Sequence, residues 1–249
     1  MIPTNAFQYL QSLEEINLSL SRVENIETAA FLGLLKVKVI QLDGNKISKI
    51  SRGSFNGLFN LKTLNLSNNI IQEIEDDSFH GSSAIQYLDV SYNKLTTIPE
   101  KLLEPLTMLT MLNISNNLLQ SLQGNLCYNF INLQFIMLNN NQLSEVDPCL
   151  HLLKVIELSL SNNLLKNLSQ SLLPKNVQKL WIAHNNIEEL DEDLFANTHS
   201  LSILDISGNV LNFIPQNIFE ACISLKFLDI SENIISIFDP IPFIAYEIY

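Results

Sequence analysis

Apolar and polar positions alternate along the chain in one recurring arrangement. A leucine-like residue is followed by two variable positions, then by two apolar residues at alternate places, and shortly afterwards by an asparagine, as in LKTLNLSNN from Leu61. This spacing at a fixed period predicts a single repeat solenoid over residues 1–249, with a partial repeat at 1–12, instead of one or two globular domains. The repeats start at Leu13, Val37, Leu61, Ile85, Leu109, Leu133, Val155, Val177, Leu201 and Leu225.

The alternating segment of each copy predicts a short β-strand. Successive side chains of a strand point to opposite faces, so Leu64 and Leu66 face inward while Thr63, Asn65 and Ser67 face outward. One unit cannot bury its own apolar face, but parallel stacking at about 4.8 Å builds a shared core. We therefore expect a curved α/β solenoid with a parallel sheet on its concave face and irregular or short helical segments on its convex face.

The asparagine after each strand recurs in every copy except the first, where Ser21 takes its place. We expect its amide to turn inward and bond the backbone groups that the bend leaves unpaired. Because a buried polar group without a partner costs about 1–3 kcal/mol, this role is structural. The ladder consists of Asn45, Asn69, Asn93, Asn117, Asn141, Asn163, Asn185, Asn209 and Asn233.

These motifs resemble the 24-residue "typical" leucine-rich repeats of animal extracellular proteins. Toll-type receptor ectodomains, chaoptin-like adhesion proteins and secreted insect immune repeat proteins are similar. The resemblance implies a spine of stacked aromatic rings beneath the convex side, here at Phe31, Phe55, Phe79, Phe195, Phe219 and Phe243, with Leu103 and Cys127 in that place in the middle. Family members close both ends with cysteine-rich caps, and neither cap occurs, so we expect a fragment of a longer protein or an incomplete gene model.

Composition narrows the classes of partner and compartment. The 47% hydrophobic content is enough for a continuous core, and a net charge of −12 with no run of Lys or Arg argues against nucleic acid as a ligand. We recognise no signal peptide in these residues, and no apolar run among them approaches the roughly 18 residues that membrane insertion requires. Cys127, Cys149 and Cys222 are too few and scattered for a disulfide framework, and we expect Cys127 to pack as a small hydrophobe.

No combination of residues indicates catalysis, a cofactor or a metal. The four histidines, at positions 80, 151, 184 and 199, fall in different repeats and offer no set of nucleophile, base and orienting residue. A glycine-rich phosphate loop is missing. The acidic clusters at 73–77 and 188–193 lack the spacing of a calcium loop and are interpreted as solvated surface. The sequence therefore predicts a protein that is not an enzyme.

The outward positions of the strands are the natural ligand surface, because the scaffold holds them rigidly and packing does not dictate their identity. Large apolar or aromatic residues occupy several of them, and such a contiguous patch usually marks a binding site. Charged residues flank it, with Asp89 inside it and Glu157, Lys179, His184 and Asp205 towards the C-terminal side. The predicted ligand-binding residues are Tyr87, Tyr92, Met111, Phe135, Met137 and Trp181.

N-glycosylation sequons start at Asn17, Asn65, Asn113 and Asn167. They matter only if the chain enters the secretory pathway, and the repeat consensus itself tends to produce N-L-S. The first three fall on the strands of the concave sheet, so glycans there would direct recognition towards the aromatic half.

Our leading hypothesis is a recognition module of an extracellular or cell-surface receptor, or of a secreted immune or adhesion protein, that binds a protein or glycoconjugate. An intracellular scaffold, or the recognition arm of a larger enzyme or receptor, remains an alternative. The sequence leaves open whether the parent protein is membrane-anchored and whether the chain dimerises.

Overall fold

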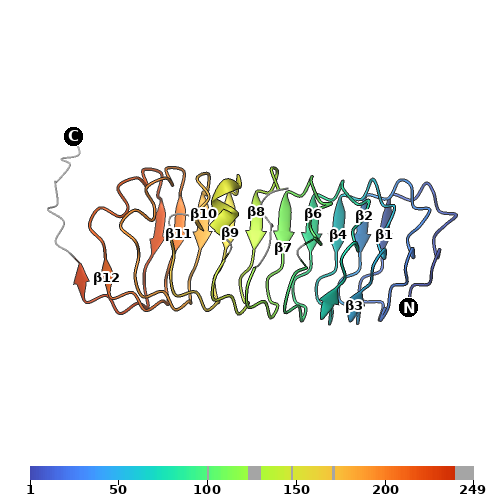
Figure 1. The fold of residues 1–249 in the computed structure, drawn as a ribbon, viewed down its shortest axis with the longest axis horizontal. Helices are drawn as coiled ribbons and strands as arrows, with labels where there is room; N and C mark the ends of the chain where they lie inside the picture. The colour runs from blue at the N-terminus through green and yellow to red at the C-terminus, as the bar shows by residue number, and fades with distance from the viewer. Residues whose placement is uncertain (100, 123–129, 147, 170–171, 239–249) are drawn as a thin grey trace.

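The protein is an elongated stack of repeats built around one long parallel sheet (Figure 1). The computed structural model describes residues 1–99, 101–122, 130–146, 148–169 and 172–238. Ten three-residue strands pair in parallel with their neighbours along the chain, and each begins two residues after the leucine-like residue that opens its repeat. They are β1 (Glu15–Asn17), β2 (Val39–Gln41), β4 (Thr63–Asn65), β6 (Tyr87–Asp89), β7 (Met111–Asn113), β8 (Phe135–Met137), β9 (Glu157–Ser159), β10 (Lys179–Trp181), β11 (Ile203–Asp205) and β13 (Phe227–Asp229).

The opposite side of the solenoid carries little regular structure. Two-residue strands form two further parallel pairs, β3 (Lys49–Ile50) with β5 (Glu73–Ile74) and β12 (Phe213–Ile214) with β14 (Ile237–Phe238). One 3-10 helix, η1 (Pro148–Leu152), is described in full. The fold is thus the leucine-rich-repeat horseshoe that the sequence predicts.

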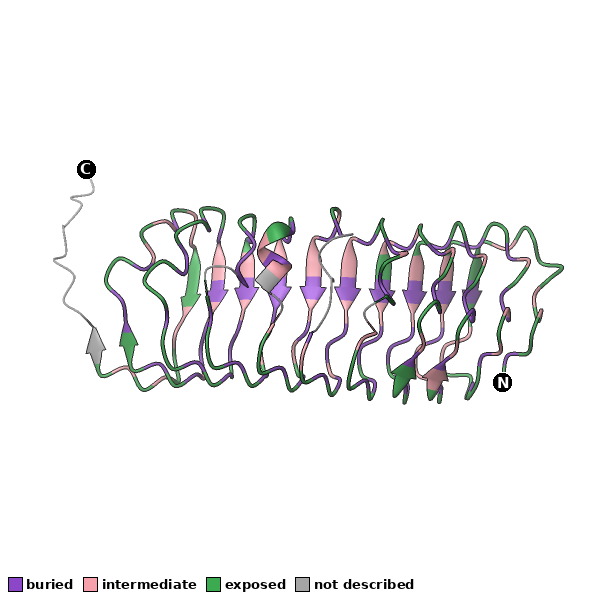
Figure 2. Ribbon diagram, viewed as in Figure 1, coloured by how far each residue is buried: buried purple, intermediate pink, exposed green. Residues whose placement is uncertain are grey.

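The core runs the length of the solenoid behind the sheet (Figure 2). From β1 to β11 the central residue of each three-residue strand points inward and is buried, and Leu64 and Leu180 are fully so. In β13, the last strand of the sheet, the equivalent Leu228 is 39% exposed. One orientation expected from strict alternation is wrong: Ser67 is buried, because β4 ends at Asn65 and the backbone has already turned by two residues later.

Stacked phenylalanines fill the side of the core away from the sheet. Phe7, Phe31 and Phe55 follow one another at centroid distances of 5.6 and 5.5 Å with nearly parallel rings, and Phe79 continues the row at 5.8 Å. Leu103 stands one repeat further on and is also buried. Phe243 lies outside the described residues.

The recurrent asparagines point into the solenoid at the end of each strand. Asn93 is typical: its Oδ1 accepts from the Ile71 N–H at 2.9 Å, and its Nδ2 lies 3.0–3.1 Å from the carbonyls of Leu66, Val90 and Ser91. Each side chain therefore links its own repeat to the preceding one. In the first repeat, which has Ser21 instead, Asn45 Oδ1 accepts from two N–H groups, those of Ser21 and Val23.

The two cysteines that the structure describes differ in their bonding state. Cys149 is disulfide-bonded, which the count of cysteines did not predict. Cys222 is free and buried, and burial raises the pKa of its thiol although Thr198 lies within hydrogen-bonding distance. Cys127 lies outside the described residues.

Candidate binding face

The sheet presents two columns of outward side chains. We number the residues of each repeat from the leucine-like residue that opens it, which is position 1. Positions 3 and 5, the first and last residues of each strand, project from the concave face. Strand register aligns Tyr87, Met111 and Phe135 side by side at position 3 of β6, β7 and β8. Tyr87 is 45% exposed and the other two are half-buried. The structure therefore brings these three predicted residues together in one apolar row.

Two other predicted residues, Met137 and Trp181, occupy position 5 and are also half-buried. Met137 ends β8, next to the apolar row, whereas Trp181 lies two strands away with Ser159 of β9 between them. The indole of Trp181 is held in place, because its Nε1–H donates to Glu157 Oε1 at 3.1 Å. Lys179 Nζ donates to the other oxygen of that carboxylate, also at 3.1 Å. Trp181 is thus a preorganised aromatic side chain at the edge of the patch.

At position 5 most repeats have a residue whose side chain stabilises the end of the strand. When it is Asn or Asp, its side-chain oxygen accepts from the backbone N–H two residues on, at 2.8–3.1 Å, and closes the end of the strand. Met137 and Trp181 cannot make this bond, so their identity is not explained by the needs of the turn. The residues that make it are Asn17, Asn65, Asp89, Asn113, Asp205 and Asp229.

The remaining predicted residue, Tyr92, lies beyond β6 at position 8, where every repeat has a left-handed backbone. The φ values range from 52° to 65°, a region that favours Gly and Asn. Tyr92 adopts φ 52° and is 56% exposed, so neither backbone preference nor burial explains a tyrosine there. The residues of this column are Leu20, Gly44, Asn68, Tyr92, Asn116, Asn140, Asn162, His184, Gly208 and Glu232.

A shallow hollow of about 220 Å³ adjoins the apolar row on the concave face. Tyr87 and Met111 form one wall, and the buried Leu64 and Leu88 lie at its base. The hollow has the size to receive one large side chain of a partner. Sequence reasoning missed it, because it arises from the small Thr63 standing beside the large Tyr87 in adjacent strands.

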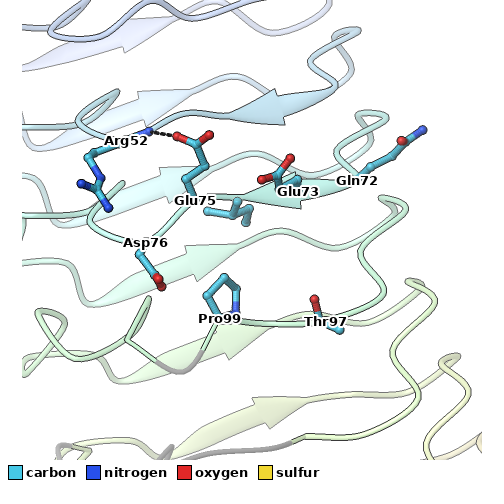
Figure 3. A pocket seen from close by; sticks show the side chains of 8 residues that line it. Arg52, Gln72, Glu73, Glu75, Asp76, Thr97 and Pro99 are labelled. Atoms are coloured by element: carbon cyan, nitrogen blue, oxygen red, sulfur yellow. Dashed lines mark hydrogen bonds between the residues drawn. The ribbon is translucent and has the colours of Figure 1, made fainter.

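A larger hollow, of about 560 Å³, lies on the other side of the solenoid beside β5 (Figure 3). Its polar groups are mostly paired: Glu75 accepts from the backbone N–H of Arg52 at 2.8 Å, and Lys49 bridges Glu73 and Glu75 at 3.1 and 2.5 Å. These contacts lower the pKa of Glu75, first through the Lys49 hydrogen bond, and raise that of Lys49. This hollow is therefore a self-satisfied polar surface and a weaker candidate than the concave face.

The four sequons differ in accessibility. Asn17 and Asn167 are exposed. Asn65 and Asn113 are half-buried, and the amide nitrogens to which a glycan would attach donate to Asp43 at 3.2 Å and to Asp89 at 3.1 Å. A glycan on Asn113 would also stand between Met111 and Met137. Glycosylation of all four sites remains a prediction, and these contacts favour Asn17 and Asn167.

In the part of the chain that the structure describes, no group of three or more His, Cys, Asp or Glu side chains is arranged to hold a metal ion. The same residues include no helix with the length and hydropathy that crossing a bilayer requires.

Comparison with known proteins points to one family. The profile of the family described as Leucine rich repeat matches residues 11–69, 59–119 and 175–235. No curated protein matches the chain by sequence.

Solved structures extend the likeness to almost the whole chain. Toll of Drosophila, in a complex with Spatzle, superposes with a TM-score of 0.85 at 26% identity over 94% of this chain and 32% of its own. The leucine-rich-repeat protein FLRT2, from a complex with Latrophilin 3 and Unc5D, gives a TM-score of 0.79 at 26% identity over 90% of this chain and 69% of the matched chain. TLR13 in a complex with single-stranded RNA gives 0.68 at 26% identity over 92% and 38%. The chain thus spans about a third of the length of Toll.

Proposed function

The chain belongs to the leucine-rich-repeat family, and we propose that it is a non-enzymatic recognition module that binds a protein partner through its concave face. The proposed contact residues are Tyr87, Tyr92, Met111, Phe135, Met137 and Trp181. Its mechanism is surface complementarity: a rigid sheet presents apolar and aromatic side chains whose geometry is fixed before the partner arrives.

The observation that carries this proposal is the departure of Met137 and Trp181 from the position-5 pattern. Six other repeats use Asn or Asp there to close the strand end. Replacing such a residue by a large apolar one removes a hydrogen bond and leaves apolar surface half in water. Because both residues lie on the same face as the row formed by Tyr87, Met111 and Phe135, a binding role accounts for all five together.

An extracellular or cell-surface location is part of the proposal. The disulfide at Cys149 supports it, since such bonds persist in oxidising compartments and are rare in the cytosol. The exposed sequon at Asn167 is compatible with it. The alternative of an intracellular scaffold requires reduced cysteines, so mass spectrometry of the protein from a secreting host, before and after reduction, separates the two locations.

A protein ligand fits this face better than nucleic acid. Asp89, Asp205 and Asp229 lie in the position-5 column, and the whole chain carries a net charge of −12, both of which repel phosphates. TLR13, which superposes on this chain, was nevertheless solved in a complex with single-stranded RNA. The binding experiment therefore includes RNA as a second class of ligand.

The test uses substitutions that follow the repeat's own preference. Met137→Asn and Trp181→Asn place at position 5 the residue that closes the strand end elsewhere, and thermal melts verify that both variants fold. Leu20→Asn introduces the same residue at position 8 of the first repeat, where asparagine suits the left-handed backbone, away from the patch and from the hollow beside Tyr87, and is the matched control.

The chain, made multivalent, is applied to an array of secreted and cell-surface proteins and to single-stranded RNA. We expect one or more protein partners that the Leu20→Asn control retains and the double variant loses by at least about tenfold, as removal of hot-spot residues does. Equal binding by the double variant, or binding of RNA alone, would contradict the proposed function.

A further inference from the structure

The C-terminal end of the proposed contact face combines one aromatic ring with unpaired negative charge. Trp181 at the end of β10 is in register with Asp205 of β11, and Asp205 is in register with Asp229 of β13. All three side chains occupy position 5 and therefore leave the sheet on the same face, in strands about 4.8 Å apart. An aromatic ring is thus followed directly by two carboxylates.

The two aspartates keep hydrogen-bonding capacity for a ligand. Asp205 Oδ1 accepts from the Ser207 N–H and hydroxyl at 3.1 and 2.7 Å, and Asp229 Oδ1 accepts from the same groups of Ser231 at 2.9 and 2.6 Å. Within the described residues no donor reaches Oδ2 of either side chain. The bonds from Ser231 also hold the pKa of Asp229 below its ordinary value, so this carboxylate is ionised at neutral pH.

The carboxylates at the other end of the face are different. Asp43 Oδ1 accepts from Ser19 Oγ and from Asn65 Nδ2, and Asp89 Oδ2 accepts from Asn113 Nδ2. Asp89 thus has donors on both oxygens, and Asp43 accepts from both neighbouring repeats, whereas in the described part of the chain Asp205 and Asp229 accept only from the serine of their own turn.

The cation on the strand of Trp181 is already paired. Lys179 lies on the same strand as Trp181, and its ammonium pairs with Glu157, whose side chain is only 18% exposed. Glu157 in turn holds the indole N–H. Glu157 and Lys179 thus compensate one another, whereas Asp205 and Asp229 form no ion pair within the described residues.

We propose that Trp181, Asp205 and Asp229 form a subsite for a cationic side chain of the protein partner, an arginine in preference to a lysine. A planar guanidinium can stack on the indole and donate to a carboxylate at the same time, which an ammonium does less well. This inference rests on the proposed function, because it assigns a partner chemistry to one end of the same face. The partner's binding segment then has apolar residues for the row at Tyr87, Met111 and Phe135, and a basic residue beyond them.

The chain offers its own probe for this subsite, since Trp181 is the single tryptophan of the sequence. The fluorescence of the folded chain, excited selectively over tyrosine, is titrated with the blocked peptide Ac-Arg-Leu-Arg-Leu-Arg-NH2 at low ionic strength. The reference peptide replaces each arginine by citrulline, which keeps the shape and removes the charge.

The variants separate charge from structure. Asn65 and Asn113 show that asparagine at position 5 closes the strand end as aspartate does, so Asp205→Asn and Asp229→Asn remove only the charge. Asp89→Asn removes the same charge from the same column four strands from Trp181 and is the matched control. Thermal melts of each variant verify folding.

We expect saturable quenching with the arginine peptide bound about fivefold to tenfold more tightly than the citrulline peptide, the sum of one exposed cation–π contact and one exposed ion pair. The Asp205→Asn/Asp229→Asn variant should lose this difference, and Asp89→Asn should keep it. Equal binding of the two peptides, or an arginine preference that survives the double variant, overturns the subsite. Because these titrations use no natural partner, they fail or succeed independently of the Met137→Asn/Trp181→Asn experiment, which decides the proposed function.

Discussion

Replacing Asn93 by alanine tests how the solenoid is held together. The change removes one acceptor and two donors that sit between the copies starting at Leu61 and Ile85. Of the groups that Asn93 contacts, the three carbonyls keep another donor: Asn69 Nδ2 at Leu66, Asn117 Nδ2 at Val90, and the Asn68 N–H at Ser91. The Ile71 N–H, by contrast, loses its partner, Asn93 Oδ1.

The size of the effect follows from this inventory. Ile71 is fully buried, and a buried donor left unpaired costs about 1–3 kcal/mol. The three carbonyls lose the donor that Asn93 supplied, and this adds about 1 kcal/mol more. The loss is small because a net hydrogen bond contributes about 0.5–1.5 kcal/mol and each carbonyl keeps its other donor. We expect Asn93→Ala to lower the free energy of unfolding by about 2–4 kcal/mol, a large share of the roughly 5–15 kcal/mol of a typical domain.

Two comparisons make the prediction specific. Asn233 makes the same four bonds, to the Leu211 N–H and to three carbonyls, but it is only part-buried. Water can replace its amide, so Asn233→Ala should lower stability by no more than about 1.5 kcal/mol. Lys94→Ala, an exposed neighbour of Asn93, should change it by less than about 0.5 kcal/mol.

Urea unfolding followed by circular dichroism gives the three free energies, and hydrogen exchange at the Ile71 amide reports the local effect. In Asn93→Ala this amide should exchange faster by more than the global destabilisation explains. A loss below about 1 kcal/mol for Asn93→Ala, or an equal loss for Asn233→Ala, would refute the reasoning that burial makes the ladder indispensable.

Three further predictions test other parts of the structure. Phe55→Ala opens a gap in the aromatic stack between Phe31 and Phe79, and it should lower the free energy of unfolding by about 3–5 kcal/mol in urea. Phe59 is 67% exposed, so Phe59→Ala should lower it by less than about 1 kcal/mol. Tyr92→Asn should stabilise by about 0.5–1 kcal/mol in the same assay, since asparagine tolerates φ 52° better than tyrosine; a loss of stability would show that the tyrosine packs. The carboxylates with lowered pKa contribute stability that is complete above their ordinary pKa and is lost as pH falls through the folded value. Melting temperatures should therefore decline on acidification below about pH 4.5, and Glu75→Gln should reduce that decline; the carboxylates concerned are Glu14, Glu27, Glu75 and Asp229.

Most of the fold could be predicted from the sequence, because a repeat tests each inference many times. The period of two in the segment from Lys62 to Leu66 predicts a strand, and the 24-residue spacing predicts parallel pairing with the next repeat. Strict alternation fails at Ser67, because a strand of three residues ends before the pattern does. The disulfide at Cys149 was missed because the three cysteines were weighed only as a possible framework, and a single bridge needs no such framework.

The candidate site could be predicted only as a set of residue types on one face. The sequence assigns Phe135 and Trp181 to the same surface, yet it cannot show that Glu157 and Ser159 separate them or that Glu157 fixes the indole. Those facts depend on which atoms of neighbouring repeats meet. The hollow beside Tyr87 depends in the same way on the residue sizes in two adjacent strands.

A repeat protein provides its own standard for separating function from structure. At position 5 a hydrogen bond favours Asn or Asp, and at position 8 a left-handed backbone favours Asn or Gly, so a residue of those types needs no further explanation. Met137, Trp181 and Tyr92 break these preferences, are not fully buried, and gather on or next to the concave face. Leu20, His184 and Glu232 also depart from the position-8 preference, and Gln41 and Ser159 from that of position 5. Of these only Leu20 is a large apolar residue, and it lies at the first repeat, far from the apolar row. The binding face is therefore identified by residues that both depart from the repeat pattern and lie close together. Substituting each of them by the residue type that the repeat prefers separates its contribution to binding from its contribution to folding.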